Sequence, residues 1–418
     1  MATYYVSSNG CDNNDGLTVN TPWRTIKKAN ETLKGGDTLR FRCGDVFYGR
    51  IFPPIENDTS NPTVYTSYGE GLKPIVSQYK TANVDAWEYF GNGKWYNNVW
   101  RIDLTDINKF TGNTTDIDTN VGFLKVDGVI CPHKRFSLDD LKNKWDFYND
   151  DKYVYVKCER DPSVEANEIK IACNFHCMKF VNTLVVENIV FMGTGAHGIQ
   201  GTVHNATVRN CEFHEIGGSK LTSLNMPEVR YGNGVECWTD SSDVLVENCR
   251  FSGIYDVALT MQGNNVKDGW SNIVFRNNVI WNCQQSFEVW SSGDLPDTGF
   301  KSCVFENNVC IDSGYCWGYE VRPNKACSSH LLMYSIGCPL CDITVRGNTF
   351  YRARVAPIYC GIKNSACIPE DYRIIDNIFF IEPGQNVVEF YMHVSDKEVH
   401  SAFLEKLAKN NRIIETAF

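Results

Sequence analysis

The sequence has 418 residues, of which 43% are hydrophobic and 22% are charged, an ordinary balance for a soluble protein. Lysine and arginine are scattered and the formal net charge is -10, which disfavours binding to nucleic acid or to an anionic membrane. No apolar run is long enough to span a bilayer, and the N-terminus shows no signal peptide. We therefore expect a cytoplasmic protein, or a secreted one whose signal has been removed.

Residues 1–80 are expected to form an N-terminal cap and the first coils of a repeat structure. A helix is predicted over residues 22–33, where apolar side chains recur at helical spacing, and Gly35 and Gly36 end it. Strands are predicted over residues 37–43 and 63–68. A helix in this place would cover the open end of a stacked structure.

Residues 81–172 break the rhythm of the chain. Trp87 and Trp95 lie in a segment of alternating polarity, and strand-like stretches follow at residues 122–128 and 151–157. We expect a small β-rich insert that folds against the wall of the repeat structure.

Residues 173–382 carry a repeated phrase, such as LVVENIVF and VLVENCRF, whose central residue is asparagine or glycine. The markers are Asn188, Asn210, Asn248, Asn277, Asn307, Gly347 and Asn377, with gaps of 22, 38, 29, 30, 40 and 30 residues. Repeats of 20–50 residues indicate a repeat architecture. Each copy alternates apolar and polar residues like a half-buried strand, and the spacers are too short for helices or four-stranded blades. This predicts a parallel β-helix, in which the marker asparagine adopts the left-handed turn and bonds its equivalent one coil away.

Residues 383–418 are expected to cap the other end. A helix is predicted over residues 398–409, since Val399, Phe403 and Leu407 fall on one face. The eighteen cysteines show no zinc-site framework, and Cys338 and Cys341 form one isolated CxxC pair. Stacked inward thiols are the favoured interpretation, which suggests a reducing setting, although disulfides between coils stay open.

Several stretches resemble bacterial right-handed β-helix glycoside hydrolases. They are YYVSSNGCDNNDG, GGDTLRFRCGDVFYG and TSYGEGLKPIVS near the start, and the turns GTGAHGI and RYGNGVE. Among these enzymes they are similar to the β-xylosidase-like and related exo-acting β-helix glycosidases, and the resemblance extends to about residue 380. It implies an all-β, right-handed parallel β-helix that acts on an oligosaccharide or polysaccharide.

A second strand follows several copies of the phrase. Alignment on its inward apolar residue places Glu236, Ala258, Glu288 and Glu320 in one outward column, with Asp256 two residues before Ala258 on the same face. Glycoside hydrolysis needs a proton donor and a second carboxylate, and coils about 4.8 Å apart bring carboxylates within its range of separations. We expect the catalytic pair among these four acids and favour the first glutamate with the aspartate.

Two tryptophans share this face, and two long loops, residues 217–231 and 323–334, lie beside it. Indole faces suit the apolar face of a sugar ring, and insertions in solenoids gather on the binding side. The candidate substrate-binding residues are His197, Arg230, Tyr231, Trp238, Gln262, Trp290, Arg322 and Lys325.

Two other functions stay open. A polysaccharide lyase would use Arg322, Arg230 or Lys325 as its base, and Ca²⁺ held by the acidic column to neutralise a uronate. A glycan-binding module of the tailspike kind would need no chemistry at all. The hydrolase hypothesis requires no metal and no cofactor.

Overall fold

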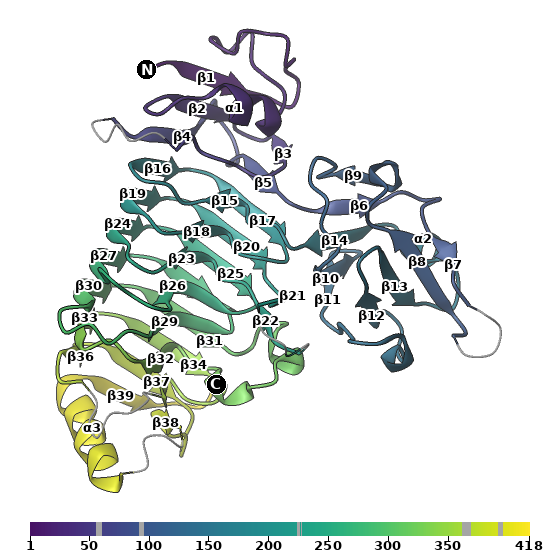
Figure 1. Cartoon of the computed structure of the whole chain (residues 1–418). Coiled ribbons are helices and arrows are strands. Elements are labelled where there is room, and N and C mark those ends of the chain that lie inside the picture. Colours follow the sequence, from purple (N-terminus) through teal and green to yellow (C-terminus); the bar gives the residue numbers. More distant parts are fainter. Residues whose placement is uncertain (56–60, 92–95, 224–225, 227, 362–368, 392–395) are drawn as a thin grey trace.

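Stacked coils of short parallel strands form the main body of the protein (Figure 1). The computed structural model describes residues 1–55, 61–91, 96–223, 226, 228–361, 369–391 and 396–418. The predicted parallel β-helix is confirmed, because successive coils pair in parallel along three sheets of the described chain.

From β15 (Met178–Lys179) onward, successive coils add strands to all three sheets, whereas the coils before the insert contribute to the first two. The first sheet comprises β1 (Thr3–Val6), β2 (Thr38–Arg42), β4 (Thr63–Tyr68), β16 (Leu184–Glu187), β19 (His204–Arg209), β24 (Ser242–Glu247), β27 (Trp270–Arg276), β30 (Gly299–Glu306), β33 (Leu340–Arg346) and β36 (Tyr372–Ile375). The second comprises β3 (Val46–Tyr48), β5 (Ile75–Ser77), β17 (Val190–Thr194), β20 (Glu212–Ile216), β25 (Arg250–Ile254), β28 (Val279–Trp281), β31 (Val309–Ser313), β34 (Thr349–Ala353), β37 (Ile378–Ile381) and β39 (Arg412–Glu415). The third comprises β15 (Met178–Lys179), β18 (Ile199–Gly201), β23 (Val235–Cys237), β26 (Val257–Gly263), β29 (Gln285–Ser291), β32 (Leu331–Ile336), β35 (Ile358–Gly361) and β38 (Val388–Phe390).

The marker asparagines turn the chain from the first sheet to the second. Asn277 and Asn307, for example, have φ of 56° and 55°, the left-handed conformation that asparagine tolerates. The predicted ladder lies one residue later, which corrects the prediction: Asn278 Nδ2 donates to Asn308 Oδ1 at 3.0 Å, and Asn308 donates to Asn348 at 3.0 Å. A side chain in the left-handed turn points outward, whereas the next one points into the coil.

The same inward position explains two other features of the repeat. In the earlier coils it holds Cys211 and Cys249, both buried as expected for inward thiols. In the last copy the inward position holds Asn377, which accepts a hydrogen bond from Asn348. The left-handed residue of that copy is therefore Asp376, with φ of 56°, and not Asn377 as predicted. Within the described part of the chain, every cysteine is a free thiol.

Aromatic stacks fill the coil interior. Phe213 lies between Phe191 and Phe251, with ring centroids 5.3 and 4.8 Å apart and nearly parallel planes. Because equivalent side chains repeat at the spacing of the coils, identical rings can stack face to face. This packing fixes the register that positions the outer face of each sheet.

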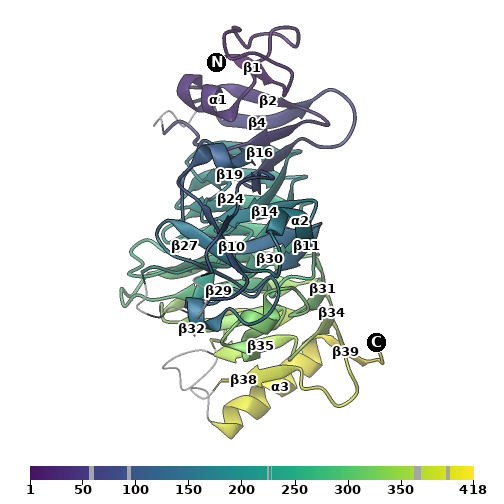
Figure 2. The ribbon, with the colours of Figure 1, turned by 90° about the vertical axis from the view of Figure 1, so that its right-hand side faces the viewer.

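The insert leaves the helix after β5 and returns before β15 (Figure 1). Its antiparallel sheets contain β6 (Lys80–Ala82), β7 (Glu88–Tyr89), β8 (Val99–Asp103), β9 (Phe110–Gly112), β10 (Val121–Val126), β11 (Val129–Cys131), β12 (Phe147–Asn149), β13 (Tyr153–Lys157) and β14 (Ile169–Cys173), with η1 (Ile107–Lys109), η2 (Leu138–Asp140) and α2 (Pro162–Glu165) between them. Strands β10, β11 and β14 lie in front of the stacked coils in Figure 2. A two-stranded ribbon of the helix, β21 (Ser219–Lys220) and β22 (Arg230–Tyr231), packs against β10. The predicted domain boundaries themselves stay predictions, and Trp95 lies outside the described residues.

Helices lie at both ends of the stack (Figure 1). Thr25 is the N-cap of helix α1 (Ile26–Thr32), and its side chain accepts the Lys28 N–H. The helix buries Ile26 and Ala29 in the core. Its role as a cap of the solenoid stays a prediction. Helix α3 (Lys397–Asn410) confirms the predicted C-terminal helix, with Phe403 and Leu407 buried. No helix in the described chain is long and apolar enough to cross a membrane.

Candidate active site

A pocket of about 660 Å³ lies over the outer face of the third sheet. Ten predicted site residues line it: His197, Arg230, Tyr231, Glu236, Trp238, Asp256, Gln262, Glu288, Trp290 and Arg322. They come from β23, β26 and β29, from the turn before β18, from β22, and from the loop that precedes β32. The outward face predicted from strand alternation therefore faces a cavity.

The register in which β26 pairs with β23 and β29 differs from the predicted one by two residues. Thr260, not Ala258, lies between Glu236 and Glu288, because Glu236 pairs with Thr260 and Thr260 with Glu288. The two glutamates thus lie two coils apart, about 9.6 Å between backbones. A shift of two residues keeps every side chain on its face, so the column survives the error.

Glu236 is buried and held by amide groups. Its Oε2 accepts hydrogen bonds from Asn233 Nδ2 at 2.6 Å and from Gln262 Nε2 at 2.5 Å. Burial raises the pKa of Glu236 to about 7, against the lowering effect of the bonds from Asn233, Gln262 and Gln200. The carboxyl is therefore partly protonated near neutral pH, which suits a proton donor.

The imidazole of His197 borders this carboxyl and stacks on that of His176. His197 Nδ1 accepts the backbone N–H of Asn233 at 2.9 Å, which leaves its proton on Nε2. Burial lowers the pKa of His197 to about 3, and that of His176, stacked 5.1 Å away, to about 3 as well. The 3.4 Å contact between His197 and Glu236 is consequently not an ion pair.

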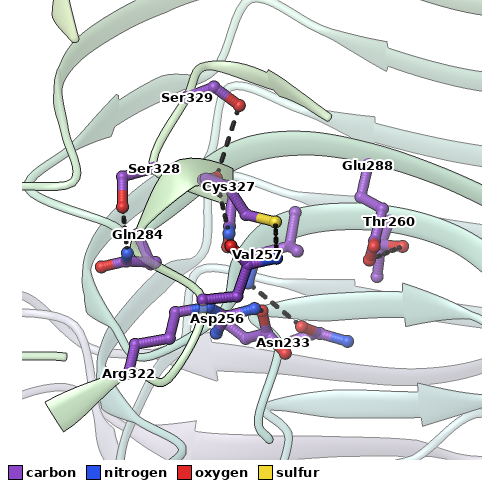
Figure 3. A network of polar contacts seen from close by, with 12 residues as sticks. Asn233, Asp256, Val257, Thr260, Gln284, Glu288, Arg322, Cys327, Ser328 and Ser329 are labelled. Atoms are coloured by element: carbon purple, nitrogen blue, oxygen red, sulfur yellow. Dashed lines mark hydrogen bonds and ion pairs between the residues drawn. The ribbon is translucent and has the colours of Figure 1, made fainter. Parts of the chain in front are cut away.

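Asp256 precedes β26 and faces a guanidinium (Figure 3). Its Oδ1 lies 2.8 Å from Arg322 Nη2, and the two side chains are 18% and 15% exposed. Burial raises the pKa of Asp256, and Arg322 opposes this shift by charge and hydrogen bonding. Arg322 Nη1 is buried and has no hydrogen-bond partner among the described residues.

Glu288 is the third carboxyl of the pocket. Thr260 Oγ1 donates to its Oε2 at 3.2 Å (Figure 3). Burial and the charge of Asp256 raise the pKa of Glu288 to about 8, against Arg322 and Thr260. Three carboxyls thus share one cavity in different surroundings. Those of Glu236 and Glu288 can be protonated near neutral pH, and that of Asp256 lies beside a guanidinium.

Half-buried indoles flank the acids. Trp290 pairs in register with Gln262, and Trp238 follows directly after β23. Both line the pocket together with Tyr334 from β32. Flat apolar faces beside carboxyls are typical of sites that bind a ring with an apolar face and a polar edge.

Arg230 joins the insert to the helix. Its Nε donates to the Gly218 carbonyl at 2.6 Å and its Nη2 to the Gly122 carbonyl at 2.8 Å, and its guanidinium lies over Tyr255. Tyr231 likewise donates its hydroxyl to Asn174. Both residues line the pocket, yet their polar groups are largely engaged by the protein.

Glu320 does not belong to the column, which corrects the prediction that places it there on a second strand. Glu320 lies in η3 (Tyr319–Val321), and Leu332 occupies the register position next to Glu288. The Glu320 side chain is 58% exposed and pairs with Arg354 at 3.2 Å and with Lys325 at 3.5 Å. Lys325, in η4 (Lys325–Cys327), is also absent from the pocket lining.

Sequence reasoning missed Asn233, the residue that organises the site. Besides its bonds to Glu236 and His197, its Oδ1 accepts the Val257 N–H at 3.1 Å (Figure 3). It thereby connects three consecutive coils. The signal was a polar residue between two glycines three positions before the glutamate, which resembles any turn.

A calcium site does not fit these residues. No group of three histidine, cysteine or acidic residues that could hold a metal occurs in the part of the chain that the structure describes. Amide N–H groups already donate to Glu236, and the Arg322 guanidinium is paired with Oδ1 of Asp256. Calcium instead requires several free oxygens around one point.

Comparisons with known proteins agree with this architecture. Residues 152–326 match the family model described as a right handed beta helix region, and the protein is a right-handed parallel β-helix. A stretch of 125 residues is 30% identical to the probable rhamnogalacturonase E of Aspergillus niger. It covers 28% of this chain and 26% of that protein, so the chain spans about a quarter of the relative's length.

Two solved structures are similar in shape. The complex of XylC with xylose shares 12% identity over 99% of this chain and 82% of that one, with a TM-score of 0.49. A rhamnogalacturonan lyase shares 11% identity over 99% of this chain and 87% of that one, with a TM-score of 0.39. Likeness this weak says nothing about reaction or substrate. The narrower expectation of a β-xylosidase-like enzyme stays a prediction.

Proposed function

We propose that this protein is a carbohydrate-active enzyme that hydrolyses a glycosidic bond of an oligosaccharide or polysaccharide. One observation carries the proposal: a single pocket, which two indoles also line, holds Glu236, Asp256 and Glu288 in unlike surroundings. Glycosidases divide the work between a protonated carboxyl and an ionised one, and unlike surroundings produce that division.

In the proposed mechanism, Glu236 donates its proton to the leaving glycosidic oxygen. Asp256, kept ionised by Arg322, either deprotonates the attacking water or attacks the anomeric carbon. Trp238 and Trp290 hold the sugar ring.

The surroundings of the basic residues support hydrolysis over elimination. Lys325 is outside the pocket lining, and the Arg230 guanidinium donates to backbone carbonyls. Arg322 is ion-paired with the acid that the hydrolase uses. None of the three basic residues is poised as a free base, and β-elimination needs one.

The test is a panel of aryl glycosides with xylan, polygalacturonan and rhamnogalacturonan, followed by reducing-sugar release and ultraviolet absorbance. Hydrolysis gives reducing ends without an unsaturated product, and a chelator should not reduce it. Glu236→Gln and Asp256→Asn should each lower kcat by about a hundred- to ten-thousandfold, the usual contribution of acid–base catalysis. Circular dichroism checks the fold of both. Near-normal rates in both variants would reject the pair, and an unsaturated product would select the lyase.

A further inference from the structure

A second hollow, of about 320 Å³, lies between the insert and the ribbon β21–β22. It is lined by Thr119, Asn120, Lys134, Arg135, Phe136, Tyr148, Asn149, Asp150, Asp151, Lys220 and Thr222. Only the last two belong to the helix; the others belong to the insert. The hollow thus exists because the insert packs against β21.

One short segment, residues 220–223, separates this hollow from the active-site pocket. Lys220 and Thr222 line the hollow, whereas Leu221 and Ser223 line the pocket. The Leu221 N–H donates to the Val229 carbonyl at 2.9 Å, and Thr222 and Ser223 begin a turn directly after β21. Neighbouring residues of this one segment line different cavities, so the two cavities lie on either side of a wall one chain thick.

The hollow combines aromatic faces with hydrogen-bonding groups. Phe136 is 38% exposed, and the half-buried Tyr148 stacks on Tyr155 with ring centroids 5.8 Å apart. Asn149 and Thr222 supply an amide and a hydroxyl beside them. A pyranose ring has an apolar face and a rim of hydroxyls, and this pairing of surfaces matches it.

Hydrogen bonds hold the two walls in place. Lys134 Nζ donates to Asn120 Oδ1 at 3.0 Å and to the Val121 carbonyl at 2.6 Å. The same Asn120 Oδ1 accepts the Lys220 N–H at 2.9 Å, and Asn120 Nδ2 donates to the Lys220 carbonyl at 2.8 Å. The insert and the helix are thus joined at the edge of the hollow, and a ligand would find it already formed.

We infer that this hollow is a distal subsite for the glycan whose reacting bond lies in the active-site pocket. The inference rests on the proposed glycoside hydrolase function. A chain that crosses the Leu221 wall reaches the Phe136 ring, so the enzyme prefers chains over short glycosides. The insert is then part of substrate recognition.

The test uses oligosaccharides of two to eight sugar residues, prepared from whichever of xylan, polygalacturonan and rhamnogalacturonan the wild type cleaves fastest. We expect kcat/KM to rise at least tenfold along this series. Phe136→Ala and the double variant Phe136→Ala/Lys220→Ala should lose most of that rise. Tyr89→Ala is the matched control, because Tyr89 is an exposed aromatic of the insert, 52% accessible, that does not line the hollow.

The outcomes separate the two proposals. A glycan that is cleaved without any gain with length, or a gain that survives in the double variant, overturns the distal subsite and leaves the hydrolase standing. Equal losses in the Tyr89→Ala control would show damage to the insert, and would also overturn it. If the wild type cleaves none of the three polysaccharides and no aryl glycoside, the proposed function fails, and the subsite fails with it.

Discussion

Replacing Gln262 by leucine tests whether Glu236 is the proton donor. The amide of Gln262 donates to the Glu236 carboxyl at 2.5 Å, and leucine keeps a similar size without a donor. The bond stabilises the ionised carboxylate, so its loss raises the pKa. Glu236 acts while it is protonated, and the rate falls as pH rises through that pKa. The falling limb of the pH profile should therefore move to higher pH in Gln262→Leu.

The size of the shift follows from the strength of the bond. A hydrogen bond to a charged group contributes about 1.5–3 kcal/mol, and one pKa unit corresponds to about 1.36 kcal/mol. Complete loss would raise the pKa by about one to two units. Because Asn233 and Gln200 still donate to the carboxyl, we expect a shift of about one unit from the wild-type value of about 7.

The assay is the pH dependence of kcat/KM, which reports the essential groups of the free enzyme. Asn264→Leu is the matched control, because Asn264 lines the same pocket and its amide forms no hydrogen bond with Glu236. It should leave the limb where the wild type has it. A limb that stays in place in Gln262→Leu would refute the role of Glu236 and direct attention to Glu288, whose pKa burial raises to about 8.

Two further predictions concern Asp256 and the asparagine ladder. Arg322→Met should lower kcat/KM by about a hundredfold or more, since unpairing a buried charge costs about 3–5 kcal/mol. Loss of the guanidinium also raises the pKa of Asp256, so the rising limb of the pH profile of kcat/KM should move to higher pH. A rising limb that does not move would contradict this. Asn308→Ala should lower the free energy of unfolding in urea by about 1–3 kcal/mol, because it leaves the buried amide groups of its ladder neighbours unpaired. Asn307→Gly, at φ of 55°, is the neighbouring control and should cost little; equal losses in the two variants would refute the ladder.

The coil architecture was predictable because the alternation within each copy of the repeat shows which side chains point into the coil and which point outward. Alternation marked the buried side of every strand, and the marker asparagine indicated the left-handed turn, as Asn277 shows. The position of the ladder was not predictable in the same way. Whether Asn277 or Asn278 turns inward depends on the turn geometry, and both residues are asparagine in that copy.

The candidate site was predictable in its face and not in its register. Pairing between coils is set by side chains inside the helix, such as Phe287, which aligns with Leu259. The sequence of one strand does not show which residue of the next strand pairs with it, and Val257 is as apolar a partner for Phe287 as Leu259 is. The position of Glu320 was mispredicted for a different reason. The residues around it alternate like a strand but form the 3-10 helix η3, and the third-sheet strand of that coil comes later, at β32.

Strands and loops contribute different things to this site. The third sheet fixes where Glu236 and Glu288 lie, since both belong to strands held by the packed interior. The sheet alone would give buried carboxyls of similar kind. Arg322 comes from the loop of the 40-residue coil between Asn307 and Gly347, and it gives Asp256 an ion pair that the glutamates lack. A solenoid can therefore acquire acid–base chemistry by lengthening one loop, because the repeat already supplies the column and the loop supplies the charge that makes its members unequal.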